Sequence, residues 1–196
     1  PKWIVIRRRD SASSWVVYHY SVGNTKRLTL DSIGAESSAS ANWFNNTSPT
    51  STTFSVGSDG GSNGSTDGYV AWCWADISGF SKFDSYTGNG STDGTFVHLG
   101  FRPAWLMVKR TSSTDSWLIT DNKRDIDNPA TQTQAPQSNR EDNVNTGDNY
   151  SIDYLSNGFK CRGSGGDLNG DGQTYIYMAF AETPETTPFD TFPNAR

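Results

Sequence analysis

An internal repeat constrains the fold of this chain more than any other feature of its sequence. The segment Pro1–Arg8 matches Pro103–Arg110 position by position, at an offset of 102 residues. The match continues without a gap through a polar stretch into a second apolar segment, which opens on Trp15 in one copy and on Trp117 in the other. Each copy therefore predicts a strand, a polar turn and a second strand.

A second pair of matching segments lies further along each copy. Tyr69–Asp76 matches Tyr175–Glu182 at an offset of 106 residues. The extra residues of the second copy fall in its middle, where 122–150 is polar and loop-like. A period near 100 residues is too long for a solenoid or a propeller blade, and it indicates duplication of a small β unit. Coincidence between β segments of similar composition is the alternative.

The composition favours a β protein with an aromatic core. The 196 residues are 33% hydrophobic, 13% aromatic and 19% charged, whereas disordered chains are poor in aromatics and rich in charge. No long amphipathic helix is visible, and Leu30–Phe44 provides a turn or two of helix at most. We therefore predict an all-β chain, an antiparallel β-sandwich of lectin or jelly-roll type built from two duplicated β units.

The repeat also sets the expected boundaries. We predict that a strand at 80–86 is joined through a turn to a returning strand at 95–101. The first copy has no counterpart of 95–102, so we expect upstream residues or another subunit to supply that strand beside Trp3–Arg8. The predicted parts are a first β repeat at 1–86, a Gly- and Asn-rich turn at 87–94, a second β repeat at 95–182 and a Pro-rich tail at 183–196.

Charge and cysteine content exclude several classes of protein. The net charge of −5 and the pI near 4.9 argue against nucleic-acid binding, which needs a basic face. No apolar run is long enough to span a bilayer, and no signal peptide is visible, so we expect no membrane insertion and regard a chain that starts at Pro1 as a processed product or a fragment. We expect Cys73 and Cys161 to be buried free thiols, with a disulfide as the alternative.

Several motifs resemble a tandem-repeat module of tailed, often marine, bacteriophages. They are Tyr69–Trp74, Phe83–Gly90, Gly100–Trp105 and Tyr175–Glu182. That module belongs to the C-terminal part of tail-fibre and other virion-surface proteins, and the closing Asn194–Arg196 resembles the C-terminus of such proteins. The resemblance implies a structural protein on the extracellular virion, other virion subunits as partners and a homo-oligomer. It implies no catalytic residues, and the polar insert at 125–150 departs from the pattern.

Few residues suggest catalysis. His19 and His98 lie in predicted strands, and the repeat aligns His19 with Asp121, so we interpret both histidines as ordinary strand residues. Asp76 and Glu182 are equivalent in the repeat and would serve glycoside cleavage only if they faced one another across a cleft. We interpret each as a charged residue that ends a strand.

One string resembles a calcium loop. Asp167, Asn169 and Asp171 supply oxygen ligands at alternate positions and are followed by Gly172. Met178 stands where such a loop has its bidentate Glu, so a hairpin turn is the preferred interpretation. We predict no cofactor and keep calcium as the alternative.

The tryptophans divide into two groups. Four recur by duplication and are predicted to be core residues: Trp3, Trp15, Trp105 and Trp117. Trp43 and Trp72 have no Trp counterpart in the other copy, so they are the candidates for an exposed sugar-binding surface.

These observations favour a non-enzymatic virion structural protein, a tail-fibre or surface-appendage module that adheres to a host glycan. An architectural capsid-decoration or filament subunit without a ligand is one alternative. A secreted carbohydrate-active enzyme is the other, and it would need two close carboxylates in a cleft.

Overall fold

The computed structural model describes residues 1–124, 127–130, 132–133, 145–146 and 148–182. Within them the chain is all-β and antiparallel, as predicted, with only short helical segments. These are α1 (Ala41–Phe44), η1 (Asp148–Tyr150) and α2 (Gly166–Asn169). The single turn of α1 confirms the short helix expected before Phe44. No helix among the described residues has the length and apolarity that crossing a membrane requires.

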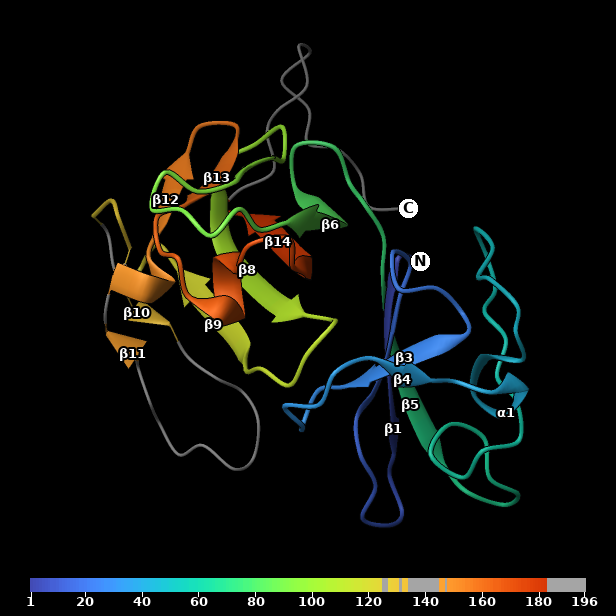
Figure 1. Ribbon diagram of the computed structural model, residues 1–196. Coiled ribbons are helices and arrows are strands. Elements are labelled where there is room, and N and C mark those ends of the chain that lie inside the picture. Colours follow the sequence, from blue (N-terminus) through green and yellow to red (C-terminus); the bar gives the residue numbers. More distant parts are fainter. Residues whose placement is uncertain (125–126, 131, 134–144, 147, 183–196) are drawn as a thin grey trace, which may run out of the picture.

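The first sheet comes from the N-terminal part of the chain, drawn in blue to teal in Figure 1. Its strands follow the spatial order β4-β3-β2-β1-β5, with β5 at one edge. Its bounds are β1 (Trp3–Arg8), β2 (Val16–His19), β3 (Lys26–Thr29), β4 (Ser37–Ser38) and β5 (Tyr69–Trp74). The strand β1 is paired on both sides, so the expected gap beside Trp3–Arg8 is wrong. Among the described strands the edges of this sheet are β4 and β5.

The second sheet has the spatial order β6-β14-β8-β9. It therefore takes its edge strand, β6, from the end of the predicted first repeat. Its bounds are β6 (Ser81–Thr87), β8 (Pro103–Arg110), β9 (Trp117–Asp121) and β14 (Thr174–Ala181).

A third sheet, in the order β12-β13-β7, packs beside the second, and β10 and β11 form a separate two-stranded ladder. Because β7 pairs with β13, the predicted hairpin between β6 and the returning strand is wrong, and β7 does not lie beside Trp105. Pairing in a sheet depends on residues far apart in sequence, which a local turn signal does not specify. The bounds are β7 (Phe96–His98), β10 (Gln132–Thr133), β11 (Asn145–Thr146), β12 (Ile152–Leu155) and β13 (Gly158–Cys161).

The strands of the first two sheets pair in the same register. In the first, Trp3 is opposite His19 on β2 and opposite Trp74 on β5. In the second, Trp105 is opposite Asp121 on β9 and opposite Phe180 on β14. These are the residues that the two sequence offsets relate. Since a shift of one residue would exchange the two faces of a strand, equal register also gives the matched residues equal faces.

An apolar cluster lies between the first two sheets. It joins Trp3, Val5 and Val17 of the first sheet to Phe83 and Trp117 of the second, among others. The rings of Trp3 and Trp117 are 5.9 Å apart between centroids, and both side chains are fully buried. Full burial of such large rings makes this cluster a major source of stability.

Each sheet has a further cluster on its other face. Ile4 and Ile6 pack with Phe44 of α1, and Leu106 and Val108 pack with the third sheet. The first two sheets are thus each covered by their own loops and short elements on one side.

Two burial predictions need correction. Trp3 and Trp117 are core residues, but Trp15 and Trp105 are only half-buried. Cys161 is a buried free thiol as expected, whereas Cys73 is free but exposed, so its predicted burial is wrong. Cys73 lies on the edge strand β5, where no described strand covers its outer side. The tail at 183–196 and most of the polar insert lie outside the described residues.

Candidate functional site

A stacked pair of indole rings forms an aromatic surface on the first sheet. The rings of Trp15 and Trp72 are 5.2 Å apart between centroids and inclined by 21°. Trp72 is 38% exposed, and Trp15 is half-buried. The guanidinium of Arg7 lies 5.5 Å from the centroid of Trp15 on this face. We call Arg7, Trp15 and Trp72 the tryptophan platform.

The sheet itself positions the platform. Trp72 on β5 lies directly opposite Val5 of β1, whose own side chain is buried below in the core. Trp15 immediately precedes β2, and its backbone N–H donates to Asp31 Oδ1 at 3.0 Å. Because side chains alternate along a strand, Arg7, Val5 and Trp72 project from the same face. The pairing of β5 with β1 and the hydrogen bond between Trp15 N–H and Asp31 therefore hold the two rings in place.

Trp43, the other predicted binding residue, lies elsewhere. It belongs to α1, is half-buried and packs on the cluster around Ile4 and Ile6. The guanidinium of Arg27 stands 4.1 Å from its ring centroid. Since Ile4 and Val5 point to opposite faces of β1, the structure does not bring Trp43 and Trp72 together. Trp15 replaces Trp43 as the partner of Trp72, and the sequence argument missed it because its repeat partner, Trp117, is a core residue.

The calcium-like string forms α2 and the turn after it. Asn169 is fully buried, and its amide Oδ1 accepts from the backbone N–H of Asn89 at 3.1 Å. Its Nδ2 donates to Asn89 Oδ1, to the Ser91 carbonyl and to the Gly163 carbonyl at 2.9–3.1 Å. The side chain of Asn169 thus joins two loops. Among the described residues no three His, Cys, Asp or Glu side chains gather as a metal-binding group, and the calcium hypothesis involving Asp167 and Asp171 gains no support from this geometry.

The two candidate carboxylates each pair with a lysine. Asp76 lies 2.7 Å from Lys2 Nζ, and its other oxygen accepts from the backbone N–H of Phe83 at 3.0 Å. Glu182 pairs with Lys123, whose ammonium lowers the pKa of this exposed carboxyl. Each carboxylate therefore ends a strand in its own ion pair, as the strand-end interpretation predicts.

The two histidines differ in environment. His98 is exposed on β7. His19 is 1% exposed at the end of β2, and its ring meets Trp3 edge-on with centroids 5.0 Å apart. Its Nδ1 accepts from the backbone N–H of Ser21 at 3.1 Å, so the ring is held in its neutral form. Burial lowers the pKa of His19 from 6.5 to about 3.

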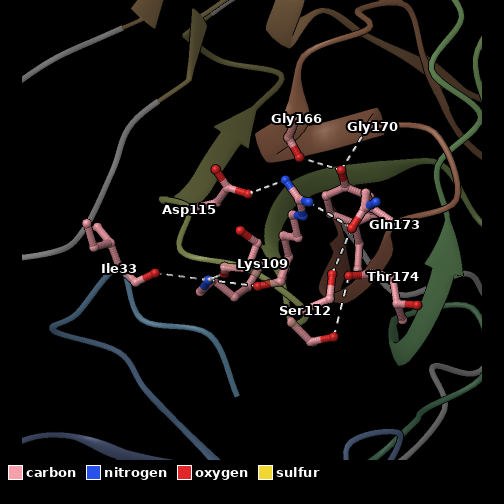
Figure 2. A network of polar contacts seen from close by, with 12 residues as sticks. Ile33, Lys109, Ser112, Asp115, Gly166, Gly170, Gln173 and Thr174 are labelled. Atoms are coloured by element: carbon pink, nitrogen blue, oxygen red, sulfur yellow. Dashed lines mark hydrogen bonds and ion pairs between the residues drawn. The ribbon is translucent and has the colours of Figure 1, made fainter. Parts of the chain in front are cut away.

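A buried lysine connects the two sheets, and sequence reasoning missed it. Lys109 on β8 is fully buried, and its Nζ donates to the carbonyl of Arg110 at 2.7 Å and to that of Ile33 at 3.4 Å (Figure 2). Its equivalent in the first copy is Arg7 of the platform. Burial lowers the pKa of Lys109 to about 8. Since its Nζ donates to backbone carbonyls, the ammonium serves as a hydrogen-bond donor that fixes the Ile33 loop.

Comparison with known proteins identifies a family. A family model described as "Domain of unknown function (DUF7483)" matches residues 1–184. Neither the curated proteins nor the solved structures gave a match.

Proposed function

The chain belongs to the DUF7483 family, and we propose that it is a non-enzymatic structural module of a bacteriophage virion surface, such as a tail fibre, which adheres to a host glycan. The observation that carries the adhesion proposal is the tryptophan platform. The partly exposed indole of Trp72, stacked on Trp15, presents apolar ring surface near the Arg7 guanidinium, and this combination suits the apolar face and hydroxyl rim of a sugar ring.

Equivalent side-chain contacts in the two sheets support the structural part of the proposal. The hydroxyl of Tyr69 donates to the Gly60 carbonyl and accepts from Gly64 N–H. Tyr175, its counterpart, makes the same two contacts with Gly166 and Gly170. These partners are related by the same offset of 106 residues as the strands. We therefore infer that the first two sheets are copies of one β unit.

A second repeated contact supports the same inference. Asn63 Nδ2 donates to the Gly57 carbonyl at 2.7 Å, and Asn169 Nδ2 donates to the Gly163 carbonyl at 3.1 Å. We further propose that the apolar cluster between the units makes a sandwich of the two sheets. Such a rigid pair of sheets suits a projecting appendage, because it presents its loops and platform without rearrangement.

Titration against a glycan panel tests adhesion. Tryptophan fluorescence and calorimetry would follow binding to wild-type protein, Trp72→Ala and Trp15→Ala, with Trp43→Ala as the matched control. We expect the two platform variants to lose roughly tenfold or more in affinity and the control to retain it. Equal affinity in all four proteins, or binding lost only in Trp43→Ala, would overturn the platform. Absence of binding to every glycan would instead favour the architectural role.

The architectural alternative has its own supporting observation. The edge of β5 leaves alternate backbone N–H and C=O groups without a neighbour among the described strands, and such edges recruit strands from partners. Sedimentation of the isolated chain would reveal a homo-oligomer. For the enzyme alternative, release of reducing ends from polysaccharides is the assay, and we expect none because Asp76 and Glu182 are engaged with separate lysines.

A further inference from the structure

The two equivalent strands β5 and β14 differ in what covers them. On β14 the residues Tyr177 and Met178 are 1% and 4% exposed. On β5 their counterparts Ala71 and Trp72 are exposed. The difference follows from pairing, because β14 lies between β8 and β6, whereas β5 has β1 as its one neighbour among the described strands. In this part of the chain the first unit therefore lacks the strand that β6 provides to the second.

The missing strand has a matching sequence at the end of the chain. The residues of β6 include Phe83-Asp84-Ser85-Tyr86, and an offset of 106 places Phe189-Asp190-Thr191-Phe192 at the equivalent positions. This is the offset that relates β5 to β14. The tail thus carries a sequence that matches part of β6, the strand that pairs with β14 and that has no counterpart beside β5 among the described strands.

We propose that residues 189–192 of the same chain add to the open edge of β5 as an antiparallel strand. The inference rests on the proposed duplication and predicts the register from that of β6 on β14. Since Met178 is opposite Phe83 and Tyr175 is opposite Tyr86, Trp72 would lie opposite Phe189 and Tyr69 opposite Phe192.

The side chains of β6 show what the added strand would bring. Phe83 is fully buried against Trp3 and Phe180, and Tyr86 stacks on Tyr175 with centroids 5.0 Å apart. Phe189 would lie beside Trp72 and extend the tryptophan platform. Phe192 would stack on the half-buried ring of Tyr69, as Tyr86 stacks on Tyr175.

Chain length permits this closure within one molecule. Six residues separate Trp74 of β5 from Ser81, and six separate Phe180 of β14 from Thr187. The end of β5 lies near the end of β14, because Ser81 pairs with Phe180 and donates through Oγ to the Ala75 carbonyl at 3.1 Å. Six extended residues span about 20 Å, more than adjacent strands require.

Proline sets the limits of the added strand. Pro188 would be its first residue, a position where proline is tolerated in sheets. Pro103 begins β8 in the same way. Pro193 follows the matched residues and marks the other end. A short edge strand bounded by prolines also resists further strand addition.

A single engineered cysteine tests the register. The proposal places residue 188 opposite the exposed native Cys73, so Pro188→Cys should form an intramolecular disulfide with it, since opposite residues have the Cα separation that a disulfide needs. Thr187→Cys is the matched control, because its side chain would project from the other face. Peptide mapping after mild oxidation would measure both yields.

We expect most Pro188→Cys molecules to carry a disulfide between Cys73 and the introduced thiol, and the Thr187→Cys control to give roughly tenfold less of its own link to Cys73. Equal yields would show random tail encounters, and a predominantly intermolecular link would show pairing with a second copy; either result overturns the proposal.

Amide hydrogen exchange, measured on protein without the engineered cysteines, gives an independent test. Ending the chain after Glu182 should speed the exchange of β5 by roughly tenfold or more and leave β14 unchanged. Exchange of β5 that does not respond to this truncation would also overturn the proposal. Glycan binding by Trp72 is measured separately, so the failure of one proposal is distinguishable from that of the other.

Discussion

Acid should destabilise this protein through one buried imidazole, and the structure sets the size of the effect. His19 is fully enclosed and neutral, with its Nδ1 occupied by Ser21 N–H and its Nε2 without a hydrogen-bond partner among the described residues. Protonation in the folded state must place a charge in this site. Burial is the main cause of the lowered pKa; the nearby Asp84 opposes it, and Lys2 adds to it slightly.

The sign and magnitude follow from proton linkage. Between pH 6.5 and about 3 the unfolded chain binds a proton at His19 that the folded chain does not, so stability falls as the pH falls through this window. At about pH 4.5 the unfolded imidazole is roughly two pH units below its ordinary pKa of 6.5, while the folded one is still neutral. The resulting loss is roughly 2–3 kcal/mol relative to pH 8.

Urea unfolding followed by tryptophan fluorescence measures this loss. Carboxylates also titrate over the same range, so the quantity to compare is the stability difference between wild type and His19→Asn, whose Oδ1 can accept from Ser21 N–H. We expect wild type to be the more stable at pH 8 and to lose roughly 2–3 kcal/mol of that advantage by pH 4.5. The exposed His98→Asn is the control and should show no such change. A difference that is constant with pH would refute the argument from buried His19.

Three further predictions, with five substitutions, test the packing and the polar contacts. Trp117→Ala should lower the free energy of unfolding by about 3–5 kcal/mol, because it leaves a cavity in the cluster between the sheets. Trp15→Ala should lower it by about 1–2 kcal/mol, because that ring is only half-buried. Denaturant titration measures both losses. Asn169→Ala should lower the free energy of unfolding by about 1–3 kcal/mol, and Asn63→Ala by less than about 0.5 kcal/mol, because Asn169 is buried and Asn63 is exposed. Equal losses would contradict this explanation. The stability of wild type relative to Lys109→Met should rise by roughly 1–2 kcal/mol from pH 8 to pH 9.5, because burial lowers the pKa of Lys109 from 10.5 to about 8 in the folded state. A stability difference that does not change with pH would contradict the burial of the charge.

The strands of the two repeated segments could be predicted because their signals are local. Consecutive apolar residues at Trp3–Ile6 and at Trp105–Val108 favour a short buried strand in each segment, and the polar stretch before Trp15 favours a turn. The segments that the repeat aligns have the same strand register in the two sheets. Signals of this kind depend only on residues adjacent in the chain.

The partners of the strands could not be predicted in the same way. The alternation in β6 identifies a strand, but nothing local says that it pairs with β14, or that β7 pairs with β13. Burial follows from those pairings: equivalent residues such as Arg7 and Lys109 differ because one faces the platform and the other the interface between sheets. The sequence therefore predicts only half of the tryptophan platform, through Trp72, because the stacking of Trp15 on Trp72 depends on the pairing of β1 with both β2 and β5.

A crystal structure of residues 1–196 would show whether the chain contains two copies of one β unit. Superposition of β1, β2 and β5 on β8, β9 and β14 should place Trp3 on Trp105 and Trp72 on Met178, with both tyrosine hydroxyls bonded to their paired glycines. A register that differs by even one residue between the two sheets would exchange the faces of a strand and contradict the claim.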